Sequence, residues 1–215
     1  MAHPRRYSPT DDLLIGLDQA LRTVFGRPMT TTRPNPAEGL VEADLDEAER
    51  RHVGRLMRVN HSGEVCAQAL YQGQAVTAHL PVVRETLERS AAEEADHLAW
   101  CESRLRELGA RRSLLNPAWY AGSFTLGALT GLIGDRWSLG FVVETERQVE
   151  SHLEGHLREI PERDIKTRTL IQQMKVDEIH HAQVAGHAGG VALPGPVRWV
   201  MKITAKVMTR TAYWI

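Results

Sequence analysis

Two short motifs pair a glutamate with a histidine at the spacing that lets one helix hold a metal ion. Glu94 and His97 are three positions apart, and so are Glu178 and His181. Residues three apart on an α-helix lie on one face, one turn apart, so each pair can direct a carboxylate and an imidazole at one cation. A single pair is common on charged surface helices, but two pairs in helical sequence predict a shared metal site.

Two further glutamates complete a repeated order. Helix bundles that hold two iron or manganese ions add one glutamate from each of two other helices to their two Glu-x-x-His motifs. Glu64 lies 30 residues before Glu94, and Glu146 lies 32 residues before Glu178, so the chain reads as a pseudo-repeat. The predicted set of carboxylates and imidazoles suits iron or manganese better than structural zinc, and no catalytic residue is predicted beyond these ligands: Glu64, Glu94, His97, Glu146, Glu178 and His181.

The third predicted ligand position has neighbouring glutamates that compete for it. Glu146 falls in line with the apolar residues Leu139, Val142 and Val149 at helical spacing. Glu144 precedes it by two positions and points roughly 200° away around the helix. Glu150 is nearer the same face but out of step with the apolar line. The periodicity therefore favours Glu146.

The elements that must position these ligands are predicted to be long helices. No stretch shows the alternation or the β-branched density of a strand, so the fold class is all-α. Each of the four long helices has one ligand glutamate in its apolar seam, and four buried carboxylates on facing helices favour a shared cation. The expected helices are Glu42–Leu80, Val82–Leu108, Pro117–Ile160 with a bend near Gly131–Gly134, Pro161 to Gly189–Gly190, and Pro196 to the C-terminus.

The N-terminal part of the chain is expected to lie outside the bundle. Met1–Pro9 is predicted to be a disordered tail, Thr10–Phe25 a short amphipathic helix and Gly26–Gly39 a linker. The predicted organisation is an N-terminal extension over residues 1–41 and a helical bundle over residues 42–215.

Composition limits the partners and the compartment. The formal net charge of −1 gives no sign of a nucleic-acid-binding protein. Cys66 and Cys101 are too few for a disulfide framework and fit a reducing compartment. No secretory signal is expected, because Met1–Pro34 is polar and Arg-rich.

Several other polar residues have two readings. Asp177 either orients an imidazole of the opposite helix, as carboxylates behind metal ligands do, or faces solvent. His152 is a candidate for a similar supporting role, with the helix surface as the alternative. His180 is expected at the surface, and Tyr71 is expected in the core.

Two stretches predict contact with a membrane surface. Trp119–Gly134 is uncharged and apolar, although it is shorter than a membrane-spanning helix. The last helix repeats a cation every four residues at Arg198, Lys202, Lys206 and Arg210, with tryptophans nearby. A basic amphipathic helix with aromatic anchors is typical of the membrane interface. The alternative is an ordinary helix packed against the bundle.

Four segments of the sequence resemble one enzyme family. They are Arg58–Glu64 (RVNHSGE), the Glu94–His97 pair, Val143–Glu146 and Asp177–His181 (DEIHH). Together they are similar to the demethoxyubiquinone hydroxylases of ubiquinone biosynthesis, over roughly Arg51 to the C-terminus.

The resemblance implies a ferritin-like four-helix bundle with an additional C-terminal amphipathic helix. It implies a di-iron monooxygenase, with two Fe²⁺ ions held at the six positions given above, that uses O2 and a reductant, NADH among them, to hydroxylate the ring of a polyprenylated demethoxyubiquinol or demethoxyubiquinone. The expected location is peripheral, at the cytoplasmic face of the inner cell membrane. A second copy of the chain and other proteins of ubiquinone biosynthesis are both open as protein partners.

A ferritin-like iron-binding or storage protein without oxygenase activity is the alternative. It would use the same ligands but has less need of the apolar Trp119–Gly134 stretch and the basic C-terminal helix.

Overall fold

The computed structural model describes residues 8–26, 29–31 and 33–215. These residues form helices and no strand, as the sequence predicts. The helices are α1 (Pro9–Val24), α2 (Glu47–Thr77), α3 (Pro81–Glu107), α4 (Asn116–Ile133), α5 (Asp135–Glu159), α6 (Ile165–His187) and α7 (Gly195–Trp214). Residues 1–7 of the expected disordered tail lie outside the described residues, and Pro9 belongs to α1.

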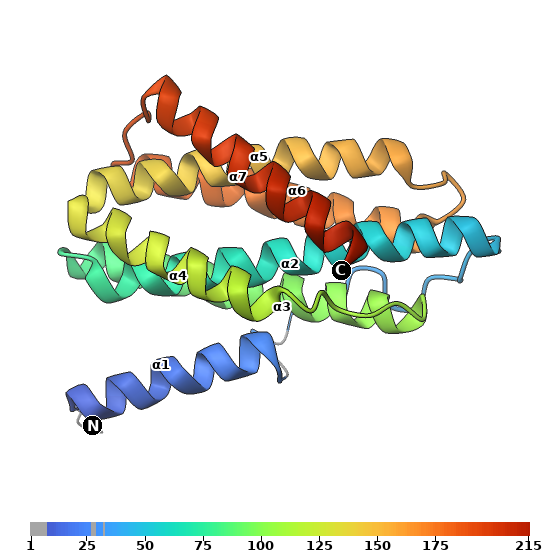
Figure 1. Cartoon of the computed structure of the whole chain (residues 1–215), viewed down its shortest axis with the longest axis horizontal. Helices are drawn as coiled ribbons and strands as arrows, with labels where there is room; N and C mark the ends of the chain where they lie inside the picture. The colour runs from blue at the N-terminus through green and yellow to red at the C-terminus, as the bar shows by residue number, and fades with distance from the viewer. Residues whose placement is uncertain (1–7, 27–28, 32) are drawn as a thin grey trace.

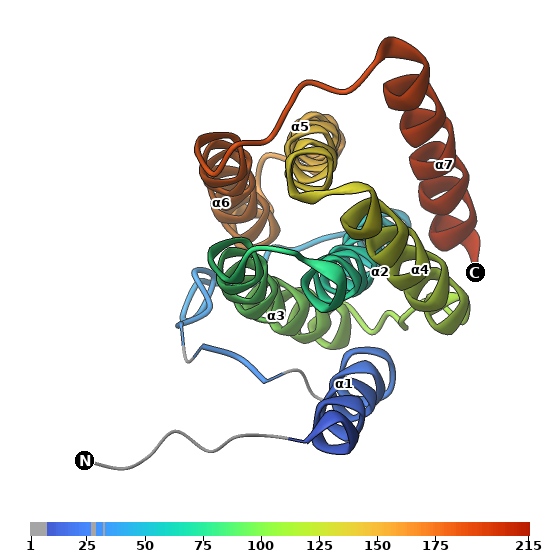
Figure 2. The same cartoon turned by 90° about the vertical axis from the view of Figure 1, so that its left-hand side faces the viewer.

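Four of the helices make a bundle seen end-on in Figure 2: α2, α3, α5 and α6. Helix α4 packs along α2, and α7 crosses the bundle obliquely on the same side as α4 (Figure 1). Helix α1 lies beneath the bundle against α2 and α4. The bundle is ferritin-like, and α7 is the additional C-terminal helix that the sequence predicts.

Local signals set the ends of the bundle helices. Asp46 caps α2, since its side chain accepts from the backbone N–H of Glu49, whose own carboxylate bonds back to the Asp46 N–H. Proline opens α3 at Pro81, where a missing N–H costs nothing. Helix α3 is followed by Gly109 with φ of 66°, a left-handed conformation that favours glycine.

The helix expected from Pro117 to Ile160 is two helices. The chain breaks at Gly134, whose φ of 131° lies outside the range that other residues adopt readily. Asp135 then fastens the start of α5 to the α2–α3 turn, because its carboxylate accepts from the backbone N–H groups of His79 (2.9 Å) and Leu80 (2.8 Å). The predicted bend is therefore a complete stop, with α4 and α5 on separate axes.

The interior of the bundle has a polar layer between two apolar clusters. One cluster contains Met57, Cys101, Leu153 and Met174 among its buried residues. The other includes Tyr71, Leu87, Leu139, Val142 and Ala185. On each of the four helices the ligand glutamate predicted from the sequence lies between these two clusters. The four glutamates are therefore at one level of the bundle.

A buried arginine fastens α3 to α6 below this layer. Arg104 is 1 % exposed, and its guanidinium contacts Asp164 (3.1 Å) and donates to the hydroxyl of Thr167 (2.7 Å). The same guanidinium reaches Glu42 in the segment before α2 through two bonds, of 2.6 and 2.8 Å. Every charge in this group is paired, as burial requires.

None of the described helices is long and apolar enough to cross a bilayer. Exposed apolar side chains occur on α1 (Leu14, Ile15, Leu17 and Leu21) and on α4 and α7: Leu126, Leu129, Leu132, Ile133, Val197, Trp199, Val200, Ile203, Val207 and Trp214.

We predict that Gly127 holds α2 and α4 at their close approach. A Cβ at Gly127 would lie 2.2 Å from the carbonyl oxygen of Leu70, a backbone atom that cannot move aside alone. Gly127→Ala should lower the free energy of unfolding by about 2 kcal/mol, the scale of overpacking in a close-packed interior. Chemical denaturation measures this loss.

Gly122→Ala on the same helix is the matched control, because a Cβ there meets nothing within 4 Å. It should leave stability unchanged or raise it by up to about 1 kcal/mol through helix propensity. Equal stabilities for the two variants would show that the close contact is not a constraint.

Candidate metal centre

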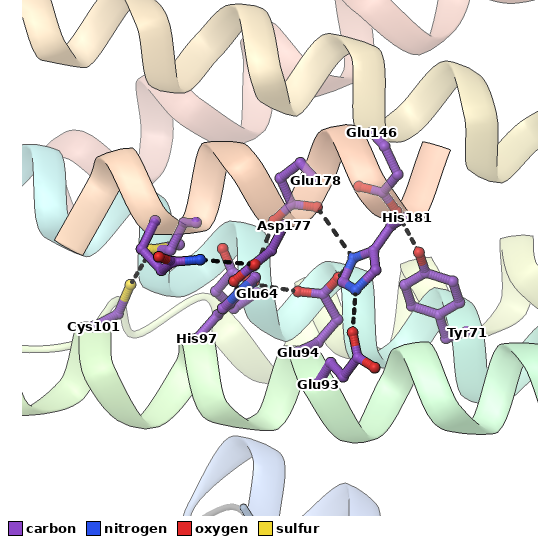
Figure 3. Close-up of polar contacts among 12 residues, drawn as sticks. Glu64, Tyr71, Glu93, Glu94, His97, Cys101, Glu146, Asp177, Glu178 and His181 are labelled. Atoms are coloured by element: carbon purple, nitrogen blue, oxygen red, sulfur yellow. Dashed lines mark hydrogen bonds and ion pairs between the residues drawn. The ribbon is translucent and has the colours of Figure 1, made fainter. Parts of the chain in front are cut away.

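Four side chains from three helices converge in the polar layer. Glu64 comes from α2, Glu94 and His97 from α3, and Glu178 from α6 (Figure 3). Each of them offers one potential ligand atom, and these atoms lie within 4.8 Å of one another in a group whose members are all buried. The sequence predicted all four as ligands, and the structure brings them together.

Glu94 and Glu178 each face two imidazoles. One oxygen of Glu94 lies 3.1 Å from His97 Nδ1, and its other oxygen lies 2.9 Å from His181 Nδ1. The corresponding distances from the two oxygens of Glu178 are 3.4 Å to His97 Nδ1 and 3.6 Å to His181 Nδ1. These two carboxylates therefore lie between the histidines, where each can serve two cations.

Glu146 lies in the interior beside His181. Its side chain is 1 % exposed, and its Oε1 accepts a hydrogen bond of 2.6 Å from the hydroxyl of Tyr71. Glu144, the competing candidate, is half-buried on the other side of α5, where its carboxylate accepts from Gln148. The structure thus directs Glu146 and not Glu144 toward the predicted ligands.

Outer carboxylates fix which nitrogen of each histidine faces the centre. The Nε2 of His97 lies 2.9 Å from Asp177, and the Nε2 of His181 lies 2.8 Å from Glu93. A carboxylate can only accept, so each Nε2 carries a proton. When a cation occupies the centre, each ring would be neutral and its unprotonated Nδ1 would face the cation. This is the arrangement by which metal-binding histidines are oriented in proteins.

The donor set fits a cation. Two buried carboxylate oxygens without a hydrogen-bond partner lie here, Glu146 Oε2 and Glu178 Oε2. Burial raises the pKa of the Glu64 carboxyl well above its usual value, and burial does the same to Glu146. Several buried carboxylates placed this close together are stabilised in their charged form by a metal ion. Oxygen and nitrogen donors without a thiolate are the set expected for iron or manganese.

The supporting residues only partly match the sequence-based expectations. Asp177 takes the first of its two readings and orients His97 from the opposite helix. His152 instead packs against His156, with 4.0 Å between the two ring centroids. Both histidines line a cavity of about 410 Å³ between α2, α5 and α7. Burial lowers the pKa of His152 to about 4 and that of His156 to about 2. His180 is exposed, as expected.

Glu93 and the hydroxyl contact of Tyr71 were not predicted from the sequence. Glu93 directly precedes Glu94 as Asp177 directly precedes Glu178. Extending the pseudo-repeat by one residue would have found it. Tyr71 was expected in the core and is 1 % exposed there. Its position two turns after Glu64 brings its hydroxyl to Glu146, a contact that the apolar pattern alone does not reveal.

A four-helix bundle with carboxylates and imidazoles gathered at its centre defines the ferritin-like class of proteins. Within that class, the chain belongs to the COQ7 family: the family model described as "Ubiquinone biosynthesis protein COQ7" matches residues 51–212.

Similar proteins cover nearly the whole chain. It is 57 % identical over 211 residues to the 3-demethoxyubiquinol 3-hydroxylase of Nitrosococcus oceani, which covers 98 % of this chain and 99 % of that protein. The proteins of the same name from Ectopseudomonas mendocina and Azotobacter vinelandii are 54 % and 55 % identical over 215 residues, with full coverage of both chains. The match extends through the N-terminal segment that the family model leaves out.

We predict that Glu146→Ala weakens metal binding by at least about tenfold, the lower end of the loss seen when a side chain supporting a metal site is removed. Its carboxylate is buried beside His181, so no exposed group can replace it. Glu144→Ala should bind metal as the unaltered protein does, because its side chain faces the other way. Iron titration of the anaerobic, metal-free proteins gives both affinities, and the opposite ranking would assign the ligand to Glu144.

Proposed function

We propose that this protein is a di-iron monooxygenase that hydroxylates the ring of a polyprenylated demethoxyubiquinol, or demethoxyubiquinone, in ubiquinone biosynthesis. The observation that supports this most directly is the placement of Glu94 and Glu178, each between His97 and His181. The names of the similar proteins supply the substrate class and the reaction.

The proposed ligands divide into two overlapping groups. Glu64 and His97 belong to one metal position, Glu146 and His181 to the other, and Glu94 and Glu178 are shared by both. Two Fe²⁺ ions held there would supply electrons to O2, so that one oxygen atom enters the ring and the other leaves as water. The reductant that restores the Fe²⁺ state is NADH in this proposal.

The chain's own residues set the conditions for that chemistry. The apolar clusters on either side of the polar layer exclude water from it. Asp177 and Glu93 hold the Nε2 protons, which keeps each Nδ1 available to a cation. The Tyr71 hydroxyl holds one oxygen of Glu146 and leaves the second without a hydrogen-bond partner.

The test is turnover by purified, iron-loaded protein. Anaerobic reconstitution should give two iron ions per chain, and addition of O2, NADH and a demethoxyubiquinol should yield the ring-hydroxylated product, detected by mass spectrometry. Iron uptake without product, even when the iron is reduced anaerobically by dithionite and the excess is removed before O2 is added, would favour the iron-storage alternative. Binding of a single ion per chain would refute the paired site.

We further propose that the protein attaches peripherally to the cytoplasmic face of the inner cell membrane through α4 and α7. Both views put these helices on the same side of the bundle (Figures 1 and 2). Helix α7 combines four cations with exposed apolar side chains, and only Ala212 of this helix is buried. Its C-terminal end is fastened to α2, where Arg55 stacks on Tyr213 and Trp214. Met201 packs against the bundle, whereas Arg198, Lys202, Lys206, Arg210 and the apolar side chains of this helix named above are exposed and can meet a lipid surface that holds the substrate's isoprenoid tail.

We predict that Lys202→Glu together with Lys206→Glu weakens binding to anionic liposomes. Each cation near such a surface contributes on the order of 1 kcal/mol, so reversing two should cost a few kcal/mol and reduce the salt dependence. Turnover of a long-tailed substrate should fall, whereas a short-tailed soluble analogue should still be hydroxylated. Liposome co-sedimentation and the two turnover rates measure this.

Arg84→Glu with Arg89→Glu makes the same change in net charge on exposed positions of α3, away from α4 and α7. This control should keep most of the liposome affinity. If it loses as much as the α7 variant, overall charge and not the α7 surface controls attachment.

A further inference from the structure

Two described residues of the linker between α1 and α2, Thr31 and Arg33, contact the bundle beside the metal centre. The backbone N–H of Thr31 donates to Asp96 Oδ1 (2.8 Å), and its hydroxyl donates to the other oxygen of the same carboxylate. Arg33 Nη2 lies 2.9 Å from Asp177 Oδ1 and 2.8 Å from Oδ2. Asp96 directly precedes His97, and Asp177 directly precedes Glu178, so both contacts are next to predicted ligands.

Arg33 approaches His97 from two sides. Through Asp177 it acts on the Nε2 proton of the imidazole, since the carboxylate that binds the guanidinium also accepts from His97. Its guanidinium carbon also lies 5.0 Å from the ring centroid of Trp100, in a cation–π contact. The Trp100 ring in turn lies 5.3 Å from the ring of His97. Arg33 therefore contacts both Asp177 and Trp100, which in turn contact His97.

The two halves of the centre differ in this respect. Asp177 is 13 % exposed and has His97, Arg33 and Gln173 as partners, the last at 2.9 Å. Glu93 holds the equivalent place for His181 but is 34 % exposed, and the ion pair described for it is with that histidine. The pseudo-repeat makes the two halves alike in ligands, whereas the contacts of the described linker residue Arg33 support the His97 half.

We propose that Arg33 is a positioning residue for the metal bound at His97, and that the N-terminal linker makes the two metal positions unequal. This inference rests on the proposed di-iron centre. Arg33 fixes the Asp177 carboxylate in the orientation that holds the Nε2 proton of His97, and so keeps Nδ1 directed at Glu64, Glu94 and Glu178. Arg33 lies outside residues 51–212, which the family model matches, in a segment over which the similar proteins also align.

Cobalt titration of the full-length, metal-free protein tests the inference without relying on turnover. Co²⁺ accepts the same oxygen and nitrogen ligands, and its visible absorption bands report the geometry around each ion. We expect the unaltered protein to bind two Co²⁺ ions per chain. Arg33→Gln should weaken one of the two by about tenfold, as expected when an outer partner of a metal ligand is lost, and should alter its bands while the second ion binds normally.

Matched variants separate positioning from general stability. Asp177→Asn should change the same ion as Arg33→Gln, because both act on His97, and Glu93→Gln should change the other ion. Arg33→Lys keeps the charge and should recover part of the lost affinity. Arg22→Gln on α1 removes an ion pair with Asp18 of the same exposed helix and should alter neither ion.

The outcomes distinguish this inference from the proposed function. If Arg33→Gln and Arg33→Lys both bind two Co²⁺ ions with unaltered affinities and bands, Arg33 does not position the metal, while the di-iron proposal stands. A lower unfolding temperature of the metal-free variant with unaltered cobalt bands would likewise reduce Arg33 to a structural role. Failure of the unaltered protein to bind a pair of ions would overturn both proposals.

Discussion

Four carboxylates in the middle of the bundle are almost completely shielded from water. Glu64, Glu94, Glu146 and Glu178 are each at most 3 % exposed, and they come from four different helices. Bringing like charges together in a medium of low polarity is strongly unfavourable unless a cation or a proton compensates. The helices can therefore pack closely at this level only with the charge neutralised, which couples the order of the bundle to occupancy of its centre. The apolar clusters above and below keep the layer dry and so preserve that coupling.

The carboxylates around the centre extend this coupling outward. Asp177 on α6 holds a histidine of α3, and Glu93 on α3 holds a histidine of α6, so each helix orients the other's imidazole. Arg104 fastens the same two helices below the centre. The contacts described between α3 and α6 are thus rich in charged partners, whereas α2 and α4 meet through glycines at close backbone distance. The halves of the pseudo-repeat are therefore joined by charged contacts as well as by the two apolar clusters.

Residues with a local signature could be predicted from the sequence, and those that depend on the path of the chain could not. Helical periodicity separated Glu146 from Glu144, since the two point to different sides of one helix wherever that helix lies. The role of Asp177 was one of two readings, because only the approach of α3 decides between them. Arg33 gave no signal at all: its partner is 144 residues away, and the contact depends on where the linker crosses the bundle. The stop at Gly134 appeared only as a bend, because glycine tolerates a helix as well as the positive φ found here.

Because the helix stops at Gly134, the direction of the apolar side chains on α4 does not fix the direction of Glu146 on α5. In one continuous helix, the direction in which Leu126 or Leu129 points would be tied by 3.6 residues per turn to the direction of Glu146. Any adjustment of the apolar face would then rotate the carboxylate away from its neighbours. With the axes separate, α4 can present its apolar side chains outward while α5, anchored at Asp135, keeps Glu146 pointing inward. The orientation of the outer surface and the alignment of the centre can consequently change independently in sequence.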